Sequence, residues 1–332
     1  MKNILALTFL TLLFPLTALA QASPSCVEFQ ALIKSTYTFK PSKLSESAQN
    51  EKAVEMDKIW EMAKANQKEL VPCLRAALET PGANQWFRFD GSNLLVSLDP
   101  TPESKRVQIR AFETVDLDDT SLEIWVRTLA RRGAEGFDVS AAGARWLEYP
   151  KAQYSLTLHG GYAVKSFEGA LFIFGSMDEA QATPALLKIV NQPNHPGREA
   201  ALEVLMLQST DESLRALRAV DKTKLSTEIQ RNLQTILSKP QLITPRSKPK
   251  TSREEFVRAF EDISNGKWDK FFGLVAQVQD GEKDVVAVMK PEDLPLVRKV
   301  RRLFIANANQ HAIEYYDTFT SILMTMVWKS AQ

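Results

Sequence analysis

The sequence predicts an all-α fold, and two observations predict it. Few stretches alternate apolar with polar residues, and only 13 of the 332 residues are glycine, which disfavours strands joined by tight turns. Four consecutive segments each carry a single apolar face at helical spacing: Asp178–Asn191, Gly197–Gln208, Asp211–Val220 and Ser226–Leu237. A helix with one apolar face must bury it against a neighbour, so we expect a stacked helical array with further helices on either side.

The composition bounds the class of protein. Hydrophobic residues make up 44% and charged residues 24% of the chain, which is ordinary for a globular protein and excludes a disordered one. The length allows two or three domains or one elongated array. The formal net charge is +1, whereas a nucleic-acid-binding domain is normally basic, so we expect no nucleic-acid partner.

Residues 1–20 have the features of a signal peptide. Lys2 precedes an apolar run that ends in the small-residue cleavage pattern of Ala18–Ala20. Pro15 and the shortness of the run argue against a membrane-spanning helix, and no later segment reaches the roughly 20 apolar residues that a span requires. We therefore expect an exported protein with no transmembrane segment after signal removal, periplasmic in a Gram-negative bacterium and secreted otherwise.

The chain contains two cysteines, Cys26 and Cys73, and an oxidising compartment favours a disulfide between them. That bond would close a loop of about 47 residues and stabilise the fold by at most about 4 kcal/mol. The alternative is a pair of buried free thiols. No Cys-x-x-Cys pattern indicates a zinc or redox motif.

Residues 21–99 are expected to form an N-terminal helical region. Its helices are predicted over residues 24–34, 46–65 and 69–78. The densest aromatic cluster of the chain, Trp86–Phe89, precedes Asp90-Gly91, which the sequence favours as a turn. We expect this cluster to be core at the seam between two regions; the alternative is an exposed contact hot spot.

Residues 100–238 continue in helices. One is predicted over 103–115, a second carries Trp125 and a third carries Trp146. Residues 149–162 interrupt the helical pattern and are expected to be a loop. The very apolar segment Phe167–Phe174 is expected to be a fully buried helix.

The segment Gly197–Leu205, followed by Ser209–Asp211 and by leucines three residues apart, resembles the second helix and turn of HEAT-type repeats. Pro184 in the preceding helix is similar to the proline that often bends the first helix of that family; here it is expected to kink the helix or to start a second one. Weaker copies extend the resemblance over residues 100–238. It implies a HEAT-like α-α superhelix, or α-solenoid, that serves as an interaction scaffold, and it carries no catalytic residues over.

The remaining chain divides into a linker and a C-terminal region. Residues 239–251 are rich in proline and basic residues and are expected to be an exposed linker, with an arm for an anionic surface as the alternative. Residues 252–332 are expected to form a C-terminal helical region. One of its helices ends near Ala306 and carries the basic run Val297–Arg302, which we expect to be a solvated face, with an anion or membrane patch as the alternative. Residues 309–328 fit a helix face but are rich in strand formers.

Motifs for catalysis are absent from the sequence, which has no nucleotide-binding glycine pattern, no His-Glu-x-x-His and no Gly-x-Ser-x-Gly. We therefore predict no catalytic residue, no metal ligand and no cofactor. Two groups are candidate binding residues. The first group lies in one turn and consists of His195, Arg198 and Glu199; the alternative for His195 is a helix-capping role. The second group lies on one helix face and consists of His311, Glu314 and Asp317; the alternative there is a polar cluster.

Three hypotheses about function follow. The first is an exported, non-catalytic α-solenoid scaffold that binds a protein or cell-envelope partner. The second is an enzyme or small-ligand or metal-binding protein whose site lies between the repeats and the C-terminal region and includes His311, Glu314, Tyr315 and Asp317. The third is a carrier of apolar ligands lined by Trp125, Trp146 and Phe167–Phe174.

Overall fold

The structure is a computed structural model of the 332-residue chain. It describes residues 24–40, 45–119, 121–149, 156–158, 162–164, 166–208, 210–238, 252–265 and 285–306, with the single positions 267, 273 and 277. Three predicted segments therefore lie outside the described residues: the signal peptide at 1–20, the linker at 239–251 and the segment 309–328.

The all-α fold class is correct. The first helices are α1 (Pro24–Thr36), α2 (Glu46–Ala65), α3 (Gln67–Glu79), α4 (Gln85–Leu98), α5 (Pro102–Phe112), the 3-10 turn η2 (Leu117–Asp119), α6 (Leu122–Ala134), α7 (Ser140–Glu148) and α8 (Ser166–Gly175). The later ones are α9 (Glu179–Val190), α10 (Arg198–Gln208), α11 (Asp211–Ala219), α12 (Thr227–Ser238), α13 (Arg253–Ser264), α15 (Val285–Val288), η4 (Pro291–Asp293) and α16 (Leu294–Ala306).

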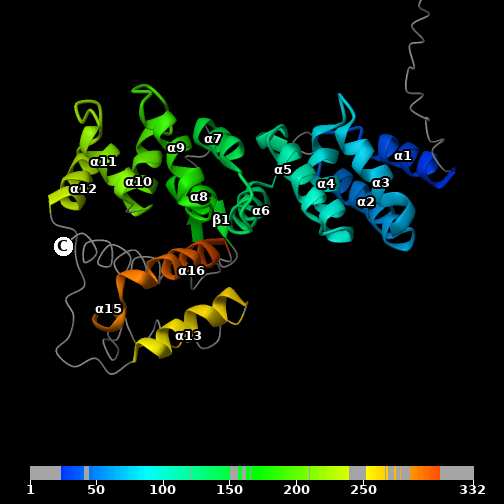
Figure 1. The fold of residues 1–332 in the computed structure, drawn as a ribbon. Coiled ribbons are helices and arrows are strands. Elements are labelled where there is room, and N and C mark those ends of the chain that lie inside the picture. Colours follow the sequence, from blue (N-terminus) through cyan, green and yellow to red (C-terminus); the bar gives the residue numbers. More distant parts are fainter. Residues whose placement is uncertain are drawn as a thin grey trace, which may run out of the picture.

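The middle helices pack in two rows (Figure 1). In the even row α6 contacts α8, α8 contacts α10 and α10 contacts α12. In the odd row α7 contacts α9 and α9 contacts α11. Each odd helix also packs on the even helix that follows it. A helix with one apolar face is thus covered by neighbours on both sides, as the amphipathic patterns require.

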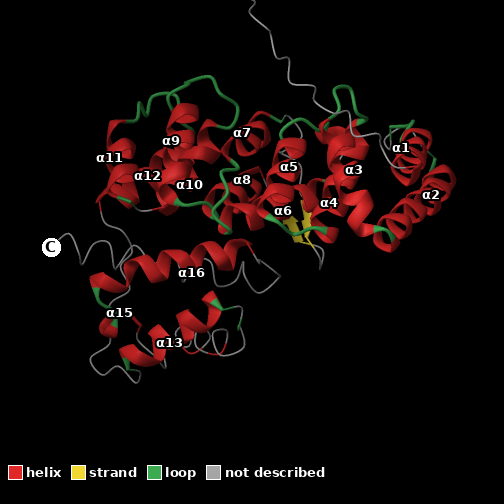
Figure 2. Ribbon diagram, turned by 45° about the vertical axis from the view of Figure 1, so that its right-hand side comes forward, coloured by secondary structure: helices red, strands yellow, loops and turns green. Residues whose placement is uncertain are grey.

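The C-terminal helices return to the middle of the array. Helix α16 packs on α6 and α8 of the even row, and α13 packs on the other side of α16 (Figures 1 and 2). Val297, Val300 and Phe304 of α16 are buried, as are Phe256 and Phe260 of α13. The face of α6 and α8 that an isolated stack would expose is therefore covered by α16.

The four helices predicted with most support are present within two residues of their expected ends, as α9 to α12. Side chains that accept from the first-turn amides fix the starts of α9 and α11: Asp178 accepts from Ala180 and Thr210 accepts from Ser213. Pro184 does not start a second helix, because α9 continues through it as one helix. Pro184 is exposed, so the carbonyl that its ring leaves unpaired can reach water.

The prediction of a loop over residues 149–162 is wrong in part. Residues Leu156–Leu158 (β1) and Tyr162–Val164 (β2) pair antiparallel, with Thr157 opposite Ala163. Strand β1 contacts α6 and β2 contacts α8. Each strand has three residues, which is too short for a period of two to stand out from the surrounding sequence.

The prediction of a turn at Asp90-Gly91 is also wrong, because both residues lie inside α4. A Cβ at position 91 would come within 2.7 Å of the ring of Phe87, one turn earlier, and within 3.2 Å of Leu78 on α3. Gly91 therefore allows the close approach of an aromatic ring and a neighbouring helix, and it does not mark a chain reversal.

Two apolar clusters fill the interior. The first, here called the N-terminal cluster, is formed by buried side chains from α1 to α5: Phe29, Ile33, Tyr37, Ile59, Ala63, Leu70, Leu74, Leu78, Phe87, Leu94, Leu95, Leu98 and Val107. The main cluster is larger and runs from Phe89 through α5 to α12 and on to α13 and α16. It includes Trp125, Trp146 and Phe174, all fully buried, so these side chains fill core volume.

The predicted aromatic seam is confirmed. Phe87 belongs to the N-terminal cluster and Phe89 to the main cluster, and each is 3% exposed. From Phe89 a series of rings continues into the main cluster through Phe112 and Trp125, with centroids 5.2 and 6.5 Å apart. Phe87 and Phe89 are two residues apart on α4, so their side chains leave the helix on different sides and serve different cores.

Cys26 and Cys73 form a disulfide, as predicted, with their Cα atoms 5.8 Å apart. The bond joins α1 to α3 within the N-terminal cluster. Among the described helices, none is both long enough and apolar enough to cross a membrane.

Candidate functional site

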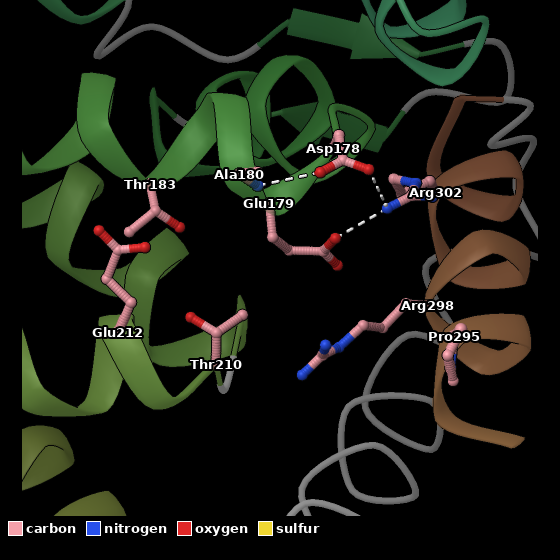
Figure 3. A pocket seen from close by; sticks show the side chains of 9 residues that line it. All are labelled: Asp178, Glu179, Ala180, Thr183, Thr210, Glu212, Pro295, Arg298 and Arg302. Carbon is pink, nitrogen blue, oxygen red and sulfur yellow. Dashed lines mark hydrogen bonds and ion pairs between the residues drawn. The ribbon is translucent and has the colours of Figure 1, made fainter. Parts of the chain in front are cut away.

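A cleft of about 380 Å³ lies where the C-terminal helix α16 meets the helical array. Figure 3 shows its lining: Asp178, Glu179, Ala180, Thr183, Thr210, Glu212, Pro295, Arg298 and Arg302. One wall is the start of α9, a second is the start of α11, and the third is α16. The volume falls at the lower end of the range for small-molecule pockets, about 300 to 1,000 Å³.

Capping residues place two helix starts beside each other in this cleft. Asp178 caps α9 through a 3.0 Å hydrogen bond from the Ala180 amide. Thr210 caps α11 by accepting from the Ser213 amide, and the Ser213 hydroxyl accepts in return from the Thr210 amide. Because α9 and α11 are neighbours in the odd row, both of their first turns open toward α16.

A network of buried ion pairs joins α16 to α9. Arg301 is 2% exposed and donates from Nη2 to Oε1 of Glu179 over 3.0 Å. Arg302 donates from Nη1 to Oε2 of Glu179 over 2.7 Å and to Oδ2 of Asp178 over 3.2 Å. The carboxylate of Glu179 is thus shared by two guanidinium groups, which compensates much of the cost of burying the three charges.

The expectation that the basic run Val297–Arg302 forms a solvated face is wrong for Arg301, which is buried. Val297 and Val300 bury one face of α16, and Arg301 lies at its border. The spacing of the arginines could have indicated a shared contact, because Arg298, Arg301 and Arg302 stand three and four residues apart and lie on one side of the helix. Their partner, Glu179, is 122 residues away from Arg301 in sequence, and no local pattern identifies it.

Arg298 has no hydrogen-bond partner for Nε among the described residues, although that atom is buried. Figure 3 shows its guanidinium extending from α16 into the cleft, away from the Arg302 pairs. On the opposite wall Glu212 is exposed and belongs to the first turn of α11. Within the described part of the chain the cleft therefore holds one unpaired cation and one unpaired anion.

The three predicted binding residues at the α9–α10 turn lie together, and each bonds the backbone of this or a neighbouring turn. His195 Nδ1 accepts from the Gly197 amide over 3.1 Å, and its carbonyl accepts from the Arg198 amide. Arg198, 5% exposed, donates to the carbonyls of Val190 and Asp221. The carboxylate of Glu199 accepts from the Ser226 amide just before α12. His195 therefore orders the turn before α10, and both its capping role and ligand binding at these residues stay predictions.

The second predicted group, His311, Glu314 and Asp317, lies outside the described residues together with Tyr315. Where the structure is described, no group of three or more histidine, cysteine, aspartate or glutamate side chains could hold a metal ion.

A second cleft of about 350 Å³ lies along the odd side of the array, lined by Asp116, Leu117, Asp118, Arg145, Glu148 and Tyr149. Arg145 donates to the carbonyls of Phe112 and Val115 at the end of α5. The Tyr149 hydroxyl donates to Asp118, and burial beside that carboxylate raises the pKa of Tyr149 above its ordinary value. The polar groups of this cleft largely satisfy one another and hold the α5–α6 connection to α7.

A buried acid lies in the N-terminal cluster. The carboxylate of Asp90 accepts from the hydroxyl of Tyr37 and, over 3.5 Å, from the indole of Trp60. Burial raises the pKa of Asp90 above the usual carboxyl range, while the two donors act in the opposite direction. The three residues come from the end of α1, from α2 and from α4, so this group links three helices through one oxygen atom.

Comparison with known proteins gives no relative from which a site could be transferred. No protein-family model, no curated protein and no solved structure matches the chain.

Proposed function

We propose that this chain is an exported HEAT-like α-solenoid that acts by binding a protein or cell-envelope partner. The observation that carries the proposal is the pair of helix rows, in which each helix contacts its neighbours in series. Arrays of this kind offer long surfaces to partners and are used chiefly for recognition. The resemblance of Gly197–Leu205 to a HEAT helix and turn supports the same class.

Export is supported by two observations. Residues 1–20 have the order of a signal peptide, and Cys26 forms a disulfide with Cys73, which requires an oxidising compartment in most organisms. The proposed localisation is the periplasm or the extracellular medium. Fractionation of the native cells with an antibody to the chain, together with mass spectrometry of its first residue, tests this. An intact Met1 on a cytoplasmic chain would overturn it.

The proposed partner surface is the odd row. Helix α16 covers α6 and α8 of the even row, so α9 and α11 present the longest open side of the array. Lys188 on α9 and Arg218 on α11 are exposed there. We expect a photo-crosslinking residue at either position to capture one partner in stoichiometric amounts in the native envelope.

The matched control places the same crosslinker at Arg258, which is exposed on α13 and away from the odd row. Capture from Lys188 and Arg218 but not from Arg258 supports the proposal. Recovery of the uncrosslinked monomer at all three positions, in cells that express the protein at its normal level, contradicts it.

A second candidate function is small-ligand binding in the 380 Å³ cleft between the array and α16. This is the location expected for a ligand site between the repeats and the C-terminal region, but with a different residue set. Native mass spectrometry of protein purified from its own host tests it: a bound small molecule supports the candidate, and a mass equal to that of the bare chain argues against it.

A further inference from the structure

The groups left without partners at the cleft are hydrogen-bond donors. Nε of Arg298 is buried on the α16 wall and has no acceptor among the described residues. Nε2 of Gln208 is also buried without an acceptor there, and the Gln208 side chain is 1% exposed. A buried donor without an acceptor is costly, so Arg298, which lines the cleft, favours an acceptor supplied from outside the chain.

Gln208 is connected to the cleft through Thr183. The Thr183 hydroxyl, which lines the cleft, donates to Oε1 of Gln208 over 2.8 Å. The Thr183 oxygen can still accept from a ligand donor in the cleft.

The negative charges of the lining are largely committed. Asp178 and Glu179 both bond Arg302, and Glu179 also bonds Arg301. These two carboxylates and two guanidinium groups cancel in charge. Arg298 and Glu212, on opposite walls, remain to interact with a ligand.

We propose that this cleft binds a zwitterionic amino acid or short peptide, with its carboxylate on Arg298 and its ammonium group toward Glu212. The proposal rests on the second candidate function and names its ligand class. A carboxylate matches the planar fork of the guanidinium and can accept two hydrogen bonds from it. Thr183 lies on the Glu212 side of the cleft, across from Arg298 (Figure 3), so its oxygen can accept from the ammonium group.

The surrounding acids select against more strongly charged anions. Once the paired charges cancel, Arg298 and Glu212 remain, so a phosphate group with nearly two negative charges gains one cation but is repelled by Glu212. The ammonium group of a zwitterion offsets the remaining repulsion because it approaches Glu212. Phosphate is therefore expected to bind more weakly than an amino acid or a dipeptide.

Isothermal titration calorimetry of the purified protein tests the proposal with four probes. They are the dipeptide alanyl-alanine, its N-acetyl derivative, its C-terminal amide and inorganic phosphate. We expect the dipeptide to bind in a saturable way and the acetylated form to bind several-fold more weakly. The amide and phosphate should bind at least about tenfold more weakly than the dipeptide, because each lacks one matched charge. No saturable binding of the dipeptide, or tighter binding of phosphate, would overturn the proposal.

Variants assign the binding to the cleft. Arg298→Ala is expected to weaken dipeptide binding about tenfold or more, and Arg298→Lys less, because lysine keeps the charge but loses the fork. Glu212→Gln is expected to reduce the affinity for the dipeptide to that for its acetylated form. Thr183→Val is expected to weaken binding several-fold.

The matched control is Arg258→Ala, which removes an exposed arginine from α13. Its affinity for the dipeptide should equal that of the unmodified protein. Circular dichroism of each variant confirms folding, and Arg298→Lys serves if Arg298→Ala does not fold. Unchanged dipeptide affinity in a folded Arg298 variant would contradict the assignment. A ligand that co-purifies while the dipeptides fail to bind would leave the second candidate function standing and remove only this inference.

Discussion

The N-terminal cluster and the main cluster are held in different ways. The N-terminal cluster is small, and a disulfide between α1 and α3 crosslinks it. The main cluster is large, and a buried ion-pair network attaches its last helix, α16, to α9. A small core buries too little apolar surface to be very stable on its own, so a covalent bond contributes most there.

The disulfide and the ion-pair network therefore stabilise the molecule in different ways. The disulfide restricts the unfolded chain over a short separation, whereas the Arg301–Glu179 pair fixes where a distant helix docks. A large apolar interface such as that of α16 allows several similar positions along a helix surface. The buried charges of Arg301 and Glu179 pair in only one of these positions, so they disfavour the others.

The largest expected effect comes from Glu179→Ala. It leaves Arg301, 2% exposed, without its Glu179 acceptor, so we expect the free energy of unfolding of the main cluster to fall by about 3 to 5 kcal/mol. Hydrogen-exchange mass spectrometry during urea unfolding should report the loss in α8, α9 and α16. Glu212→Ala is the control and should change stability by less than about 0.5 kcal/mol, since Glu212 is exposed. Equal effects of the two changes would contradict the role given to the network.

Replacing both cysteines, Cys26→Ser with Cys73→Ser, is expected to cost about 2 to 4 kcal/mol because it removes the crosslink from the unfolded chain. The loss should be confined to α1–α5. Hydrogen exchange of the double variant, compared with that of the original protein with its disulfide intact, checks this. If α6 to α12 lost protection to the same extent, the two clusters would be one cooperative unit and the comparison would fail.

Gly197→Ala tests packing inside the array. A Cβ at this position would lie 2.7 Å from the carbonyl oxygen of Leu147 and 2.6 Å from its Cβ, so α7 and α10 must separate. We expect a loss of about 1 to 3 kcal/mol in the main cluster and none in the N-terminal cluster. Thermal unfolding followed by circular dichroism measures it. A variant as stable as the original would show that the α7–α10 contact is not needed.

The smallest expected effect is a change in pH dependence at Asp90. Its pKa in the folded state is raised, so its contribution to stability is full below the usual carboxyl pKa and is lost as pH rises through the raised value. Asp90→Asn should remove this decline, so that the variant gains stability relative to the original between acid and neutral pH.

Urea unfolding of the N-terminal cluster at several pH values measures the Asp90 effect. Asp57→Asn should act in the same direction and more weakly, because the charge of Asp57 contributes to the raised pKa of Asp90. A constant difference between Asp90→Asn and the original protein at every pH would contradict the assignment.

Much of the fold could be predicted from the sequence because its signals are local. Helical spacing and capping residues located α9 to α12, and two cysteines behind a segment that resembles a signal peptide predicted their pairing. Gly91 misled the prediction because glycine also serves close packing inside a helix. A site between the repeats and the C-terminal region was one of the hypotheses, but the residues of the cleft could not be predicted. Glu179 and Arg302 meet only through the docking of α16 and lie 123 residues apart.

That separation has a consequence for how the molecule is made. The chain leaves the ribosome, and by our proposal crosses a membrane, from its N-terminus onward. The surface of α6 and α8 that α16 covers must therefore stay bare while more than a hundred further residues emerge. Until then an apolar strip is open to aggregation and to chaperones. We expect the newly made protein to depend on such helpers more than its finished stability would indicate.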